Sequence, residues 1–127
     1  LELRSDFEPA VEQLRAAFVL AASAPDDATP HALAVRLSVL SATRLRESKA
    51  AHHWLTVAQF LRARLPERAP ALDAQQEVAA GYAELLDSRA QEALPHFMRA
   101  LELHQSAYGP STPGSARIQG YIATAHY

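Results

Sequence analysis

The sequence predicts an all-α protein built from antiparallel helical hairpins that repeat along one domain of 127 residues. Three observations support this fold class. Apolar residues recur at spacings of three and four, proline pairs interrupt the chain at regular intervals, and one small-residue motif returns in the same register. The β-branched residues are scattered and do not alternate with polar residues, so no segment is predicted to form a strand.

The first predicted helix covers residues 6–24. Its apolar side chains begin at Phe7, end at Ala21 and follow helical spacing throughout. The apolar stretch over residues 16–24 starts in the middle of this helix and follows charged residues, so it does not resemble a signal-peptide core.

The second and third predicted helices form a hairpin. Thr29 is the expected N-cap of a helix over residues 30–46, and Pro30 takes its first position, where a missing N–H costs little. After a short joint at Glu47 and Ser48, the next helix is predicted over residues 49–65.

Breaks rich in proline separate the hairpins and recur about every 40 to 44 residues. A fixed period in this range is typical of repeat architectures. The proline pairs are Pro25 and Pro30, Pro66 and Pro70, and Pro110 and Pro113, and the remaining helices are predicted over residues 70–87, 90–108 and 113–127.

The recurring motif is A-x3-F-x2-A at Ala93, Phe97 and Ala100. Small residues let two helices approach to about 8–10 Å, and an aromatic ring one turn on fills the gap between neighbouring hairpins. Looser copies stand one and two repeat periods before it, and a modest side chain stands twelve positions before the motif. The copies are Ala51, Leu55 and Ala58, then Ala10, Leu14 and Ala17; the modest side chains are Gly81 and Val39, with Ala123 one period after Gly81.

A small residue, twelve positions and then A-x3-[FL]-x2-A resembles the tetratricopeptide repeat. The 42-residue period and Gly109, Pro110 and Pro113 are similar to the longer kinesin-light-chain variant, most closely over residues 75–127. The resemblance implies hairpins stacked as a short right-handed superhelical array of about six helices. The chain begins with a second helix and ends with a first helix, so we expect a fragment of a longer protein.

The resemblance also implies a concave face, lined by the first helix of each hairpin, that binds a protein or peptide. The family often clamps peptide backbone with an Asn-Asn pair, which is missing from the matching positions here. The implied lining residues are Arg36, Leu40 and Thr43, then Gln75, Val78, Tyr82 and Leu85, and finally Arg117, Tyr121 and Thr124, with Gly120 among them.

Other functional sites find little support in the sequence. His52 and His53 are adjacent and point about 100° apart on a helix, and His96 and His104 are eight residues apart, so no metal site is predicted. There is no cysteine, no serine-nucleophile motif and no glycine-rich loop, so we expect neither an enzyme nor a cofactor. Trp54 has two interpretations, core packing or an exposed anchor for a partner.

Charge and hydropathy set the wider expectations. A net charge of −2 disfavours nucleic-acid binding, and no apolar run approaches the roughly 20 residues that a membrane span needs. We expect a protein-interaction module of a larger, cytoplasmic bacterial regulatory or signalling protein. The alternatives are a structural spacer or self-association element, through the end helices and without a groove ligand, and a helical enzyme or metal-binding domain.

Overall fold

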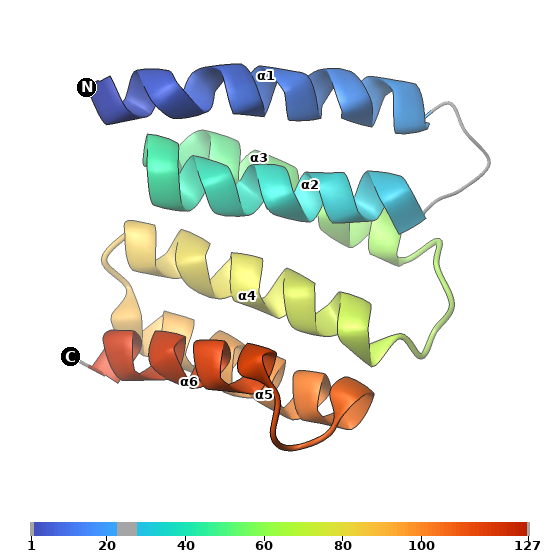
Figure 1. Cartoon of the computed structure of the whole chain (residues 1–127), viewed down its shortest axis with the longest axis vertical. Helices are drawn as coiled ribbons and strands as arrows, with labels where there is room; N and C mark the ends of the chain where they lie inside the picture. Colours follow the sequence, from blue (N-terminus) through green and yellow to red (C-terminus); the bar gives the residue numbers. More distant parts are fainter. Residues whose placement is uncertain (1, 23–27, 127) are drawn as a thin grey trace. The chain divides into compact units, whose positions relative to one another are not determined.

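The computed structural model describes the backbone of residues 2–22 and 28–126, and these residues contain helices and no strand (Figure 1). The predicted all-α fold class is confirmed. The helices are α1 (Glu2–Ala22), α2 (Ala28–Leu40), the π-helical turn η1 (Ser41–Leu45), α3 (Ser48–Arg62), α4 (Pro70–Leu86), α5 (Ala90–Tyr108) and α6 (Pro113–His126).

The chain divides into two compact units, Leu1–Glu67 and Arg68–Tyr127, which we name unit 1 and unit 2. In unit 1, α2 packs against both α1 and α3. Its core is formed by Val11, Leu37 and Leu45, with half-buried apolar side chains of α1, α2 and α3 around them. The Oγ of Ser38 on α2 donates a hydrogen bond of 2.8 Å to the carbonyl oxygen of Ala51 on α3, which ties the two helices of this hairpin together.

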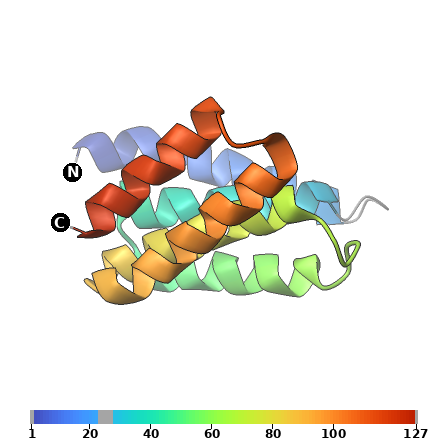
Figure 2. The ribbon, with the colours of Figure 1, turned by 90° about the horizontal axis from the view of Figure 1, so that it is seen from below.

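In unit 2, α5 packs against both α4 and α6, and α6 returns beside α5 (Figure 2). Ala93, Phe97 and Ala125 form the buried core. A β-carbon added to Gly81 on α4 would overlap the Phe97 ring of α5. Glycine is therefore required there by the close approach of the two helices, as the motif predicted.

The motif residues of both complete hairpins are buried. Ala93, Phe97 and Ala100 are each 0% exposed, and their counterparts on α3 range from 0% to 8%. Phe97 contacts ring side chains on both α4 and α6. This confirms that the aromatic residue fills the space between a hairpin and the helix after it.

The two hairpin turns contain a further repeated feature. Arg46 after α2 has φ +54° and Ser88 after α4 has φ +61°, and these left-handed residues are one repeat period apart. Each allows the next N–H to reach back into the helix: Glu47 N–H donates to the Ser41 carbonyl and Arg89 N–H to the Glu84 carbonyl, both at 2.9 Å. The repeat therefore extends to backbone conformation.

Several predicted helix boundaries are wrong. The first helix was predicted to begin at residue 6, but α1 begins at Glu2, and the second was predicted to reach residue 46, but α2 ends at Leu40 and η1 follows it. The predicted helix ends at residues 24 and 127 lie outside the described residues. The prediction placed the end of the third helix at residue 65, but α3 ends at Arg62. The guanidinium of Arg62 donates to the carbonyl oxygens of Pro66 at 2.8 Å and Glu67 at 3.0 Å, and a proline disfavours helical backbone in the residue before it. The second helix begins at Ala28, so Thr29 lies in its first turn and is not its N-cap.

Candidate functional site

The predicted lining residues of unit 2 lie on α4 and α6. Two of them, Tyr82 and Tyr121, form a contact between these two first helices. The rings of Tyr82 on α4 and Tyr121 on α6 meet edge to face, with centroids 5.1 Å apart. Both rings also contact Phe97, at 5.6 Å each. Edge-to-face packing at these distances is favourable for aromatic rings. Val78 and Leu85 are half-buried and pack against the same core cluster.

Four other predicted positions of unit 2 are exposed. Gln75 on α4 and Arg117, Gly120 and Thr124 on α6 all face solvent. The Thr124 hydroxyl donates a hydrogen bond of 3.0 Å to the Gly120 carbonyl, which lies in the same helix. Solvent-facing groups with binding capacity are therefore the Gln75 amide and the Arg117 guanidinium, on the two helices that the tyrosines join.

The predicted lining residues of unit 1 also differ from one another in exposure. Arg36 on α2 is exposed, whereas Leu40 is half-buried and packs against the unit 1 core. Thr43 is half-buried in η1, and its hydroxyl donates a hydrogen bond of 2.8 Å to the Val39 carbonyl. Arg36 is thus the predicted position on this helix whose side chain is most available to a ligand.

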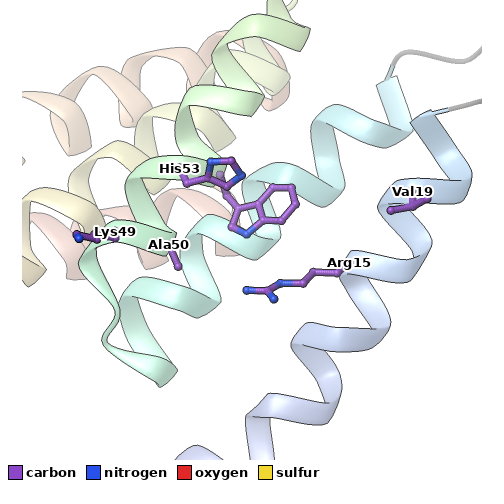
Figure 3. A pocket seen from close by; sticks show the side chains of 6 residues that line it. Arg15, Val19, Lys49, Ala50 and His53 are labelled. Carbon is purple, nitrogen blue, oxygen red and sulfur yellow. The ribbon is translucent and has the colours of Figure 1, made fainter.

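A shallow depression of about 530 Å³ lies between α1 and α3 of unit 1 (Figure 3). Arg15 and Val19 of α1 face Lys49, Ala50 and His53 of α3 across it, and Trp54 completes its lining. This depression was not among the sites predicted from the sequence. Lys49 and His53 are four apart and share a helix face, which the sequence could have indicated, but the position of Arg15 opposite them depends on how α1 packs.

The structure supports core packing for Trp54. Its ring is half-buried and meets Phe18 of α1 edge to face at 5.2 Å. The exposed His53 ring also meets the indole edge to face, with centroids 5.1 Å apart. Because the indole holds α1 and α3 together, its apolar area mainly stabilises unit 1.

The histidines are dispersed. His96 Nδ1 lies 2.7 Å from Glu77 Oε2 and links α5 to α4, and His104 Nε2 lies 2.9 Å from Thr112 Oγ1 at the start of α6. His31 is buried in α2. Among the residues whose side chains the structure describes, no group of three or more His, Asp or Glu side chains is arranged to hold a metal ion.

Comparisons of this chain with family models, curated proteins and solved structures find no match. Among the described helices, none combines the length and the apolar character needed to cross a membrane.

Proposed function

We propose that this chain is a protein-interaction module of the tetratricopeptide type, which binds a partner segment on the face formed by its first helices. The observation that carries the proposal is the direct contact of α4 and α6 through Tyr82 and Tyr121. In this proposal the contact joins the two first helices into one surface, and the exposed residues Gln75 of α4 and Arg117 of α6 contribute to it.

The chemistry of this surface favours a partner with acidic and apolar side chains. Arg117 is an exposed cation on α6, and guanidinium groups bind carboxylates in a bidentate geometry. The tyrosine pair offers an apolar edge beside Arg117. An amphipathic helix with carboxylates along one side matches these groups, whereas an extended peptide would lack the asparagine clamp of the family.

The proposal includes a right-handed superhelical stacking of the hairpins and a place in a larger bacterial regulatory protein of the cytoplasm. Its support is the 42-residue repeat in sequence, burial and turn conformation, and a composition without cysteine. The proposed role is binding and not catalysis.

Binding of a panel of fluorescent acidic amphipathic peptides, measured by anisotropy, tests this function. We expect Arg117→Glu to weaken peptide binding by about 5- to 150-fold, because loss of an interface anchor typically costs about 1–3 kcal/mol. Arg99→Glu on the second helix α5 is the matched control, since Arg99 is also an exposed arginine. Tyr82→Phe tests the hydroxyl without removing the ring from the core. Equal losses for Arg117→Glu and Arg99→Glu would place binding elsewhere.

A further inference from the structure

The depression between α1 and α3 combines apolar surface with a positive charge on each wall. Val19, Ala50 and Trp54 supply apolar surface, while Arg15 of α1 and Lys49 of α3 supply the charges. No acidic residue is among the described residues that line it. Its volume of about 530 Å³ falls within the range of small-molecule sites. A matching occupant therefore has an apolar body and a negative charge.

Both cations are available to a ligand. Lys49 is exposed and makes no hydrogen bond or ion pair with another described residue. Figure 3 shows the Arg15 side chain extending from α1 toward α3. Its Nη1 lies 3.2 Å from Glu12 Oε1, but the two side chains are 44% and 69% exposed, and ion pairs this exposed contribute little. An anion in the depression can therefore replace Glu12 as the partner of Arg15.

The repeat does not account for this lining. The motif of α5 aligns with that of α3 at an offset of 42 residues, so the counterparts of Lys49, His53 and Trp54 are Gln91, Pro95 and His96. In unit 2, α5 packs against its first helix without a lysine or a tryptophan at these positions. The hairpin fold thus does not require the residues that give the depression its charge and its aromatic surface.

We propose that the depression binds a small aromatic carboxylate. The aromatic ring of the ligand packs against Trp54 and Val19, and its carboxylate pairs with Arg15 and Lys49. A guanidinium group binds a carboxylate through two parallel hydrogen bonds, and a lysine adds a point charge. An aromatic ring also packs favourably against an indole, edge to face or offset.

This site is separate from the face proposed for partner binding. The residues predicted to line that face belong to α2, η1, α4 and α6, whereas the depression is lined by α1 and α3. The two proposals can therefore fail independently, and a small molecule in the depression adds a second binding activity to the module.

NMR titration of the isotope-labelled chain with naphthalene-2-carboxylate tests the site. Trp54 is the only tryptophan, so its indole N–H gives a single signal, which we expect to shift in a saturable manner. Naphthalen-2-ylmethanol has the same rings without the charge and should bind about 3- to 10-fold more weakly, as expected for the loss of one or two exposed ion pairs. Equal binding of both compounds, or no saturable shift with the carboxylate, overturns the proposal.

Matched charge variants locate the carboxylate. Arg15→Gln and Lys49→Gln should each weaken binding of naphthalene-2-carboxylate by about 2- to 5-fold and leave binding of the alcohol unchanged. Arg99→Gln is the control, because Arg99 is also an exposed arginine with a glutamate, Glu102, three residues away. It changes the net charge equally and should have no effect. Equal weakening by all three variants would mean that the probe responds to net charge and not to this site.

Removing the competing carboxylate should have the opposite effect. Glu12→Gln releases Arg15 from its ion pair, so we expect naphthalene-2-carboxylate to bind about 2- to 5-fold more tightly. Glu102→Gln releases Arg99 in the same way and should leave binding unchanged. Unchanged or weaker binding to the Glu12→Gln chain would contradict the role assigned to Arg15.

A larger side chain at Ala50 tests the location through shape. Ala50 is half-buried and lines the depression, so Ala50→Leu should fill part of it and weaken binding of both naphthalene compounds. Ala16→Leu makes the same change at an exposed position of α1 outside the lining and should bind both compounds like the parent. Circular dichroism checks that each variant keeps the helicity of the parent. If a folded Ala50→Leu chain binds both compounds unchanged, they occupy another surface and the proposal is wrong.

Discussion

Two buried serines in unit 1 illustrate how single hydrogen bonds act in this protein. Ser38 and Ser41 are three residues apart and both are 0% exposed. Ser38 donates a hydrogen bond of 2.8 Å to the Ala51 carbonyl, whereas the Ser41 hydroxyl has no hydrogen-bond partner among the described residues. A buried hydroxyl without a partner costs free energy, while a paired one contributes about 1 kcal/mol.

We expect Ser38→Ala to lower the free energy of unfolding by about 1 kcal/mol, and Ser41→Ala to leave it unchanged or raise it. Both substitutions remove one hydroxyl and introduce the same side chain, so their difference isolates the hydrogen bond to α3. Urea unfolding followed by Trp54 fluorescence measures both variants in unit 1. Equal changes in the two variants would mean that the Ser38 hydrogen bond contributes nothing net.

Residue patterns in the sequence predicted the close helix contacts but not every residue's role. Gly81 and the motif at Ala93, Phe97 and Ala100 stand out because few residue types permit that approach. Tyr82 and Tyr121 could not be assigned in the same way. A tyrosine on a first helix can pack through its apolar ring or bind a partner through its hydroxyl. Which role dominates depends on the neighbouring side chains, here the ring of Phe97, which both tyrosine rings contact.

At the scale of elements, the hairpin turns depend on left-handed residues that are not glycine. Arg46 and Ser88 occupy this conformation at the same repeat position. The sequence does not reveal them, because glycine is the usual signal for such a turn and neither position has one. The predicted end of the third helix at residue 65 was also wrong, since side-chain contacts such as those of Arg62 help to decide where a helix stops.

Replacing Ser88 by glycine should stabilise unit 2 by about 0.5–1 kcal/mol, because the left-handed conformation costs residues with a β-carbon about 1–2 kcal/mol, part of which the more flexible unfolded chain offsets. The control is Ser106→Gly within α5, which should destabilise by about 0.5 kcal/mol, because glycine has a lower helix propensity than serine. Thermal unfolding followed by circular dichroism compares the two variants. If Ser88→Gly instead destabilises unit 2, the Ser88 side chain contributes more to the turn than its left-handed backbone costs.

The whole molecule carries its own spectroscopic reporters for the two units. The single tryptophan, Trp54, packs on Phe18 in unit 1, whereas all four tyrosines belong to the sequence of unit 2. The core cluster of each unit is drawn from its own helices. In repeat proteins, stability is approximately a sum of unit terms and nearest-neighbour terms, so damage to one unit need not unfold the next.

Ala100→Glu tests this division. Ala100 is 0% exposed in the α5 motif, so a carboxylate there would be buried without room, at a cost of several kcal/mol. We expect the tyrosine near-ultraviolet circular dichroism of unit 2 to collapse while the Trp54 fluorescence transition of unit 1 persists. Arg99→Glu, at the exposed neighbouring position, should change neither signal. If the Trp54 transition is lost together with the tyrosine signal, the two units unfold as one cooperative structure, and the stability of each depends on the other.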